Sequence, residues 1–422
     1  MTESSGPRLD VESQERRSLR VCHVAYTFYE NDNRVIRYAE ALAEKGDEVD
    51  VIALRRPGQT KTGYSGDVRV FRIQQRAVTE KSAWIYLAKV VWFWVLSTVV
   101  LTVRQLRKPY DIVHVHNIPD FLVFSALVPK LMGARVILDI HDIVPELYAD
   151  KFGSGRRSGL FRALLFVERR SCAFANHVIV SNHIWHGRLV GRGVPAPKCT
   201  TMLNYPDLRL FKPLPVEKKR RDGRFIFLYP GTLNHHQGLD IAVKAFARVQ
   251  DRMPNAEFHI YGEGPARAEL ERLASEARFG GRVKLMNRLP LTEIANVMAL
   301  ADVGVVPKRA DGFGNEAFST KILEFMACGV PVIVPRTQVD AYYFDDSLVR
   351  FFIPGDEADL ASALLKSYEC PDHADRVQAA RTFATHLSWQ ERVVDYQLVI
   401  ESLRRQRVSR TRARRSVPER VA

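Results

Sequence analysis

Two glutamates eight positions apart, Glu316 and Glu324, could do carbohydrate chemistry. An ionised carboxylate is a strong acceptor of hydrogen bonds from sugar hydroxyls. Glu316 follows a Gly/Asn turn, so we expect it on a loop. Glu324 lies one turn into an expected helix, and the N-terminus of such a helix attracts phosphate. A sugar nucleotide offers both groups, whereas the simpler alternative is a surface pair between Glu324 and Lys321 at i, i+3.

A short helix over residues 320–327 should position these glutamates. Ser319 and Thr320 are good N-cap candidates, and Gly329 fits the C-terminal cap. The run VPVIV that follows is typical of a buried parallel strand.

Strand-like apolar runs alternate with helical patterns twice along the chain. Alternation of this kind predicts an α/β protein with two parallel sheets, and right-handed crossovers make each domain doubly wound and Rossmann-like. Ligands of such sheets bind beyond the carboxyl ends of the strands, so the two domains are expected to face a cleft. The expected strands are 20–27, 48–54, 68–73, 112–116, 135–142 and 177–182 in the first half, and 225–231, 257–265, 283–289, 303–308, 330–335 and 349–355 in the second.

Composition divides the chain into six predicted segments. Residues 1–17 are polar, lack an apolar signal-peptide core and are expected to be a disordered lead-in. The remaining segments are a first domain at 18–211, a proline-bounded basic linker at 212–224, a second domain at 225–386, a helix at 387–405 that crosses back to the first domain, and a basic disordered tail at 406–422.

The cysteine pattern indicates the redox compartment of this protein, and the charge distribution indicates its partners. The five cysteines are scattered without a CxxC pair, which favours a reducing compartment and argues against a disulfide scaffold or a zinc knuckle. The net charge is +14, and seven arginines fall within residues 404–415. A basic tail suits an anionic membrane, a nucleic acid or no specific partner. No aromatic residue interleaves these arginines, so bases have no stacking platform and the membrane is favoured over nucleic acid.

Residues 83–103 form the most apolar segment, AWIYLAKVVWFWVLSTVVLTV. This length would span a bilayer, but spanning would place strands of one sheet on opposite sides of the membrane. We therefore favour interfacial insertion, with a buried helix as the second reading and a true span as the third. Tryptophan and tyrosine suit the headgroup boundary, and basic residues follow directly.

Four motifs, in order, make the chain resemble the glycosyltransferases of family 4, which have the GT-B fold. The resemblance covers about residues 20–405. Its motifs are YPGTLNHHQGLDIAVKAF, FHIYGEGP, ADVGVVPK and NEAFSTKILEFMACGVPVI. It implies a nucleotide-sugar-binding second domain, an acceptor-binding first domain, and a metal-independent reaction that retains anomeric configuration, without a cofactor.

The resemblance also implies roles for single residues. Glu316 would contact the donor sugar or its leaving group, Glu324 the ribose, and His141 the region beside the reacting carbon. The arginine and lysine that clamp the diphosphate in the family are replaced here by Thr232 and Gln237, so another cation is expected to supply the charge. The candidate donor-binding residues are Gly231, Thr232, Gln237, Gly238, Lys308, Phe318, Ser319, Thr320, Lys321 and Glu324, with Arg309, His235 and His236 as further sources of charge.

Acceptor-binding residues are expected after the first strand and after IVHVH. Asn31, Asp32, Asn33 and Arg34 replace the glycine-rich loop of many relatives. His114 and His116 alternate along one strand and so point to the same face, and we predict that His116 meets the acceptor. A buried histidine satisfied by backbone is the alternative for each.

The sequence therefore predicts a retaining glycosyltransferase of cell-envelope polysaccharide biosynthesis. It would be cytoplasmic and peripherally attached to the inner face of the membrane. The donor would be a nucleotide sugar, most simply a UDP-sugar, and the acceptor lipid-linked or a glycan. The alternatives are a UDP-sugar 2-epimerase, a non-catalytic nucleotide-sugar-binding protein and a basic nucleic-acid binder.

Overall fold

The computed structural model describes residues 17–76, 83–151, 158–215, 222–276, 279–370 and 374–415. All but the last residue of the predicted lead-in, and the middle of the predicted linker, lie outside these ranges. The chain divides into two compact units. Unit 1 takes in the described residues of Met1–His116, Leu122–Ile137 and Arg407–Ala422, and unit 2 those of Asn117–Phe121 and Leu138–Gln406.

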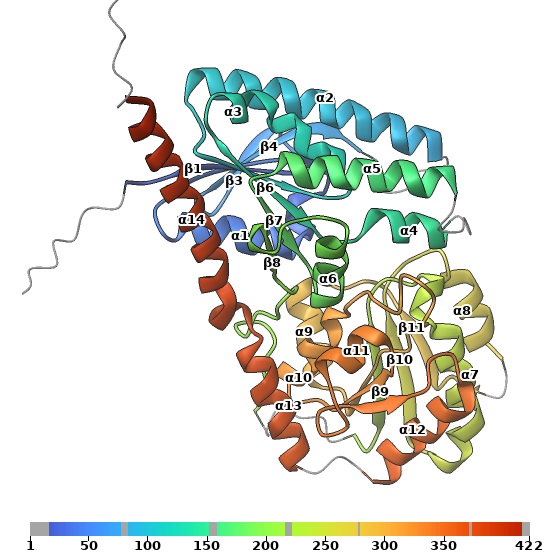
Figure 1. The fold of residues 1–422 in the computed structure, drawn as a ribbon. Helices are drawn as coiled ribbons and strands as arrows, with labels where there is room; N and C mark the ends of the chain where they lie inside the picture. The colour runs from blue at the N-terminus through green and yellow to red at the C-terminus, as the bar shows by residue number, and fades with distance from the viewer. Residues whose placement is uncertain are drawn as a thin grey trace, which may run out of the picture. The chain divides into compact units, whose positions relative to one another are not determined.

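The first sheet has eight strands in the order β3-β4-β2-β1-β5-β6-β7-β8. Helices lie on both sides of this sheet (Figure 1). β1 pairs in parallel with β2 and β5, and β2 pairs in parallel with β4, whereas β3 pairs antiparallel with β4. The strand bounds are β1 Arg20–Ala25, β2 Glu48–Arg55, β3 Thr62–Ser65, β4 Val68–Gln75, β5 Ile112–His116, β6 Arg135–Ile140, β7 His177–Val180 and β8 Cys199–Thr201.

Helices alternate with these strands, as predicted from the apolar periodicity. The helix bounds are α1 Asn33–Ala43, α2 Ala83–Arg107, α3 Leu127–Leu131, α4 Val144–Lys151, α5 Gly159–Phe174 and α6 His183–Gly191. Two short strands, β3 and β8, were not predicted, because four and three residues carry too little alternation to be recognised.

The second sheet has six strands in the order β11-β10-β9-β12-β13-β14, and its pairings are parallel. Its central strand β9 (Phe225–Pro230) separates two hydrophobic cores. Phe227 and Tyr229 belong to one core, whereas Ile226 and Leu228 belong to the other. This alternation confirms a parallel sheet covered on both faces. The other strands are β10 Ala256–Tyr261, β11 Val283–Met286, β12 Val303–Val305, β13 Val332–Pro335 and β14 Arg350–Phe352.

Helices cover both faces of this second sheet. One core includes residues of α7, α8 and α12, and the opposite core includes residues of α9, α10 and α13. The bounds are α7 Leu239–Val249, α8 Arg267–Ala274, α9 Leu291–Ala299, α10 Thr320–Ala327, α11 Gln338–Tyr343, α12 Glu357–Glu369 and α13 Ala374–His386.

The last helix, α14, spans Trp389–Arg415 and so passes the predicted end at residue 405. The basic segment was predicted to be disordered from residue 406, which is wrong for residues 406–415. Arginine is a good helix former, and the segment holds no glycine or proline before Pro418.

Candidate active site

The helix between the two glutamates forms as predicted. α10 begins at Thr320, with Ser319 as its N-cap in extended conformation. The Ser319 hydroxyl makes no capping bond, and it is buried without a hydrogen-bond partner among the residues described. Gly329 follows the helix with a φ of +70°, which supports its predicted capping role. The first turn of α10 therefore presents backbone amides and an unused hydroxyl.

The glycine turn after β9 lies against this first turn. A Cβ added at Gly231 would lie 2.3 Å from Cε and 3.0 Å from Nζ of Lys321. A Cβ at Gly238, where φ is +64°, would lie 2.1 Å from the carbonyl oxygen of Pro307. Both glycines are thus required by close approach, and the Lys321 side chain crosses the turn at Gly231.

Lys321 places an ammonium group at this turn. Its Nζ lies 5.3 Å from the centre of the Tyr229 ring. Burial lowers the pKa of Lys321, while the neighbouring Glu324 carboxylate opposes that effect. Glu324 is half-buried, on the same helix.

Thr232 and Gln237 replace the arginine and lysine that bind the diphosphate in the family, and neither side chain brings a charge to the turn. Thr232 is exposed, and its carbonyl accepts a hydrogen bond of 2.9 Å from the Tyr229 hydroxyl. The Gln237 amide nitrogen lies 2.9 Å from Nε2 of His236. Burial lowers the pKa of His236, so this imidazole is a weak source of positive charge.

Lys308 and Arg309 hold the backbone around the site. Lys308 is buried, its Nζ donates to the carbonyl of Ala317 at 2.6 Å, and it pairs with Asp340 at 2.9 Å. Arg309 makes two bonds of 2.7 Å to Asp240. Among Lys308, Arg309 and Lys321, Lys321 is the one that crosses the turn at Gly231, whereas Nε of Arg309 donates to the His235 carbonyl farther along the same turn at 3.2 Å.

Phe318 contributes packing to this region. Its ring is half-buried and lies 4.9 Å from the ring of Tyr343 and 5.9 Å from that of Phe344. These contacts fix the residue just before the N-cap of α10.

Glu316 is buried, with 4% of its surface exposed. Arg188 of α6 donates to Oε1 of Glu316, and the Asn182 side chain donates to the Glu316 carbonyl at 3.1 Å. Oε2 of Glu316 is buried and has no hydrogen-bond partner within the described ranges. The sequence reasoning missed Arg188 and Asn182, because no periodic pattern links residues more than a hundred positions apart.

Arg188 belongs to a longer ion-pair chain, Glu316–Arg188–Glu146–Arg192–Glu168. Arg188 lies 3.0 Å from Glu146, and Arg192 pairs with Glu146 and, at 2.8 Å, with Glu168. The three carboxylates are buried. Burial raises the pKa of Glu168 to about 7, against the opposing effect of Arg192.

His141 is oriented by the segment around it. Its Nε2 lies 3.1 Å from the buried Asp139 carboxylate, and its backbone N–H donates to the Asn117 side chain at 2.7 Å. The Asp139 contact favours the tautomer protonated at Nε2. The predicted role of His141 beside the reacting carbon stays a prediction.

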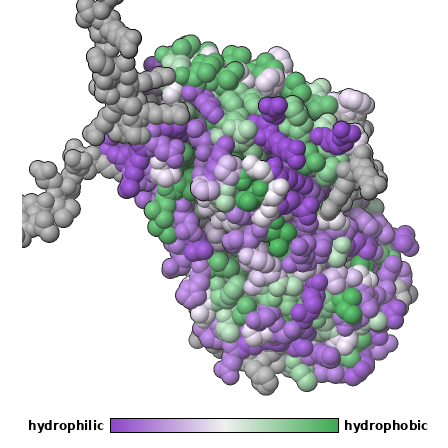
Figure 2. Space-filling model, in the orientation of Figure 1, coloured by the Kyte–Doolittle hydropathy of each residue, from purple (hydrophilic) through white to green (hydrophobic). Residues whose placement is uncertain are grey.

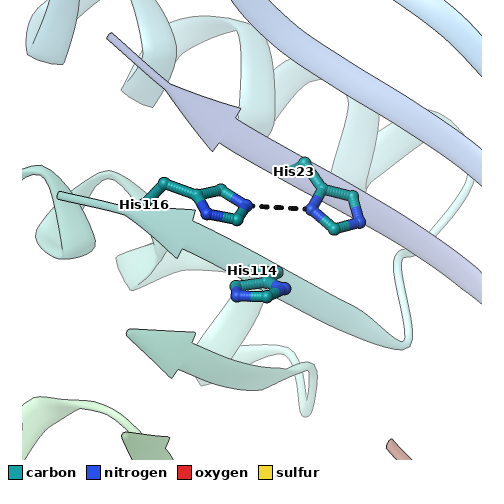
Figure 3. A group of neighbouring side chains, drawn as sticks. All are labelled: His23, His114 and His116. Carbon is teal, nitrogen blue, oxygen red and sulfur yellow. Dashed lines mark hydrogen bonds between the residues drawn. The ribbon is translucent and has the colours of Figure 1, made fainter. Parts of the chain in front are cut away.

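His116 lies in a histidine cluster with His23 and His114, which project from β1 and β5 on one face of the sheet (Figure 3). Nδ1 of His23 lies 3.0 Å from Nε2 of His116, and the rings of His114 and His116 stack at 4.2 Å. His114 and His116 do share a face, as predicted. Both are fully buried, and the hydrogen bond of His116 to His23 joins two side chains, so the predicted contact of His116 with the acceptor stays a prediction.

The histidine cluster also has the spacing of a metal site. Its ring nitrogens lie within 4.8 Å of one another. A zinc ion needs lone pairs that converge on one point about 2.0–2.1 Å away. The His114 and His116 rings are stacked, and Nδ1 of His23 and Nε2 of His116 are engaged with each other, so these side chains would have to rotate to direct three lone pairs at one metal. The predicted absence of a metal stays a prediction.

The residues predicted after the first strand have structural roles. Asp32 caps α1 by accepting from the Val35 amide at 3.3 Å. Arg34 is buried, with its guanidinium 5.2 Å from the centre of the Tyr38 ring. Asn31 is exposed and Asn33 half-buried, so these two keep side-chain surface for a ligand.

Two glycosyltransferase family models match this chain. Residues 32–204 match the family model "Glycosyl transferase 4-like domain", and residues 212–382 match "Glycosyl transferases group 1". The chain is 25% identical over 280 residues to the gpi3 subunit of phosphatidylinositol N-acetylglucosaminyltransferase from Schizosaccharomyces pombe, covering 66% of this chain and 57% of that protein. It is 23% identical over 327 residues to a human phosphatidylinositol N-acetylglucosaminyltransferase subunit, covering 76% of this chain and 62% of that protein. The chain thus spans about three fifths of these two relatives.

A bacterial relative and two solved structures are also similar to this chain. A phosphatidyl-myo-inositol mannosyltransferase from Propionibacterium freudenreichii is 24% identical, covering 66% of this chain and 67% of that protein. Sucrose-phosphate synthase from Thermosynechococcus elongatus aligns with a TM-score of 0.74 at 19% identity, covering 91% of this chain and 99% of that chain. Anabaena Alr3699/HepE in complex with UDP and glucose aligns with a TM-score of 0.68 at 16% identity, with the same coverage. These structures share the fold of two Rossmann-like domains.

Proposed function

Because this chain belongs to family 4 of the glycosyltransferases and has the GT-B fold, we propose that it transfers a sugar from a nucleoside diphosphate sugar to a lipid-linked or glycan acceptor, with retention of configuration. The observation that carries the proposal is the Lys321 side chain across the Gly231 turn at the N-terminus of α10. A cation, close backbone and a helix N-terminus together suit a diphosphate.

In this proposal the donor binds along the N-terminal part of α10. The diphosphate lies at Gly231 and Lys321, the sugar is held by the unpaired Oε2 of Glu316, and the ribose meets Glu324. The main task of the site is to stabilise the diphosphate as the glycosidic bond breaks, through positioning and electrostatics. His141, oriented by Asp139, would hydrogen-bond the sugar or stabilise developing charge.

The names of relatives suggest which nucleotide base and which class of acceptor this protein uses. Alr3699/HepE is solved with UDP, which favours a UDP-sugar, whereas two bacterial relatives are named GDP-mannose-dependent. Several relatives are named for phosphatidylinositol, and another for 2-deoxystreptamine. A lipid-linked acceptor agrees best with the apolar surface described next.

We propose that α2 attaches the protein to a membrane. Within the described residues one helix, Trp84–Arg107, is long and apolar enough to cross a bilayer, and most of it is not buried in the protein. Its inner face packs through Phe93 and Leu101, which are fully buried. Its outer face is also apolar, whereas a surface helix normally has a polar outer face. The exposed residues of this apolar patch are Trp84, Ile85, Leu87, Val91, Trp92, Val95, Val99, Val103 and Leu106 on α2, with Leu127, Leu131 and Met132 on and after α3 (Figure 2).

The sheet supports attachment in the plane of the membrane, not across it. β4 precedes α2 and β5 follows it, and both join one sheet through β2 and β1. A spanning helix would leave β4 and β5 on opposite sides of the bilayer. An in-plane helix buries its outer face at the headgroup boundary and leaves the sheet intact. Attachment to the inner leaflet would place the active site with cytoplasmic nucleotide sugars.

The experiment is a thermal-shift panel of UDP, GDP and ADP and their sugars on the full-length protein, followed by transfer of radiolabelled sugar to a membrane lipid extract. A bound donor raises the midpoint of unfolding. Lys321→Met should abolish the thermal shift caused by the free nucleoside diphosphates. Lys244→Met changes an exposed lysine of α7 and should leave that shift unchanged. No shift with any nucleotide would reject the proposal, and donor turnover without acceptor would favour the epimerase. Donor binding without transfer to any acceptor would favour the non-catalytic reading.

Membrane attachment is tested with vesicles. Trp84→Ser combined with Trp92→Ser should release the protein from vesicles that contain anionic lipid. Tyr64→Ser removes an exposed aromatic side chain outside the apolar patch and should leave binding unchanged. Full sedimentation of the double variant would contradict attachment through α2.

A further inference from the structure

The loop that carries Glu316 is held by α6, an element that neither the motifs nor the family roles assign to the donor. Arg188 donates to the Glu316 carboxylate, and Asn182, which caps α6, donates to the Glu316 carbonyl. The Trp185 ring lies 5.6 Å from the Phe313 ring in the same loop. Backbone, carboxylate and ring contacts thus join α6 to this loop at separate points.

A second contact between α6 and the region after β13 strengthens this attachment. Nδ1 of His183 lies 2.7 Å from the Tyr343 hydroxyl, and the His183 backbone N–H lies 2.9 Å from the same oxygen. The Tyr343 ring in turn packs on Phe318, two residues after Glu316. α6 therefore fixes the loop both at Glu316 and beyond it.

The ion-pair chain in which Arg188 lies is costly. It sets three buried carboxylates beside two half-buried guanidinium groups, so the acidic groups outnumber the basic ones. Removing ions from water costs several kcal/mol each, and apolar residues of similar volume often give equal or better stability. A contribution to stability alone is thus a poor explanation for the ion-pair chain. A role in orienting its last member, Glu316, explains it better.

The two oxygens of Glu316 are used differently. Oε1 accepts from Arg188, while Oε2 is buried and has no hydrogen-bond partner in the part of the chain that the structure describes. A buried acceptor left unpaired costs about 1–3 kcal/mol. A hydroxyl group of a bound sugar would satisfy it, since ionised carboxylates accept several hydrogen bonds.

We propose that Arg188 is a positioning residue for the donor sugar: it fixes Oε1 of Glu316 so that Oε2 accepts from a sugar hydroxyl, and Glu146 with Arg192 orients Arg188. This inference rests on the proposed function, because it assigns the partner of Glu316 in donor binding. Guanidinium is suited to this role, because its planar fork can engage two carboxylates at once. Lysine keeps the charge but has no such fork.

The experiment compares sugar-dependent and nucleotide-dependent stabilisation. Thermal shifts are measured with UDP and with UDP-N-acetylglucosamine, UDP-glucose and UDP-galactose, and with GDP and GDP-mannose, in wild type, Arg188→Met and Arg188→Lys. We expect both variants to keep the shift caused by the free nucleotide and to lose most of the extra shift caused by the sugar. In transfer assays, kcat of Arg188→Met should fall at least about tenfold, and Arg188→Lys should fall between it and wild type.

The control and the contradicting outcomes separate the two proposals. Arg248→Met breaks a surface pair with Glu357 and should change neither shift. If no nucleotide stabilises wild type, the proposed function fails and this inference fails with it. If the sugar nucleotide stabilises wild type and both Arg188 variants keep the full sugar increment, only this inference is overturned. If Arg188→Met does not fold, Arg188→Lys decides.

Discussion

The histidine cluster of unit 1 and the ion-pair chain of unit 2 both bury polar side chains, but they differ in how those groups are satisfied. The His114 and His116 rings stack, and a hydrogen bond, which requires one donating and one accepting nitrogen, joins His23 to His116. The ion-pair chain instead alternates carboxylates with guanidinium groups and ends on Glu316. A buried polar ring that is hydrogen-bonded costs less desolvation than a buried ion, which depends on its partners being present. Of the two clusters, the one with the larger desolvation cost is thus the one that reaches the proposed donor.

The largest expected effect comes from breaking the ion-pair chain in its middle. Arg192→Met leaves Glu168 and Glu146 without a shared partner, so we expect a loss of stability of about 3–5 kcal/mol. Thermal or denaturant unfolding measures it. Arg192→Met combined with Glu168→Leu should recover part of the loss, because one orphaned carboxylate is removed. A loss below that of the surface variant Arg248→Met would show that the chain is not energetically coupled.

The second effect is a pH dependence of the free energy of unfolding, which Glu168 of the ion-pair chain causes. Burial raises the pKa of Glu168 from 4.5 to about 7, so the folded protein binds more protons than the unfolded chain between these values. Stability from this group is therefore present below pH 4.5 and lost as the pH rises through 7, by up to about 3 kcal/mol. Glu168→Gln removes the titration, so its stability relative to wild type should increase from pH 5 to pH 8. A constant difference would contradict the assignment.

The third effect tests the histidine cluster. His23→Leu removes the hydrogen bond to His116 and leaves a buried nitrogen to find another partner, which should cost about 1–3 kcal/mol. Because no uncompensated ion is created, the loss should be smaller than that of Arg192→Met. Thermal unfolding of both variants at one pH gives the comparison directly. Equal losses would mean that burial of charge is not what distinguishes the two clusters.

The two clusters also differ in how far the sequence predicts them. The alternation in IVHVH places His114 and His116 on one face, and the structure confirms it. His23 was missed, because pairing of β1 with β5 depends on strand order. For the proposed donor site, the motifs of the family resemblance located α10, the glycine turn and Glu316. Periodicity carries no information on which distant helix meets a loop, so Arg188, 128 residues before Glu316, could not be found.

Composition likewise predicted α2 but not its surroundings. The apolar run predicted a helix, and the strands before and after it argued against a span. Which face packs on the sheet depends on tertiary contacts, since residues on both faces are apolar. The structure gives this information, with Phe93 buried and Trp92 half exposed. The end of the basic helix was misplaced because charge was weighed above helix propensity.

The smallest expected effect in free energy, though the most specific for function, is at the end of the ion-pair chain. Glu316→Gln keeps the shape of the side chain and removes its charge, while Arg188 keeps Glu146 as a partner. We expect transfer to fall at least about tenfold, or roughly 1.4 kcal/mol of barrier, with a thermal midpoint close to that of wild type. Glu324→Gln is the matched change on α10 and should weaken binding of the free nucleotide, which Glu316→Gln should not. Near-wild-type turnover of Glu316→Gln would mean that the buried chain ends on a structural residue, and the contrast with the histidine cluster would then be one of stability alone.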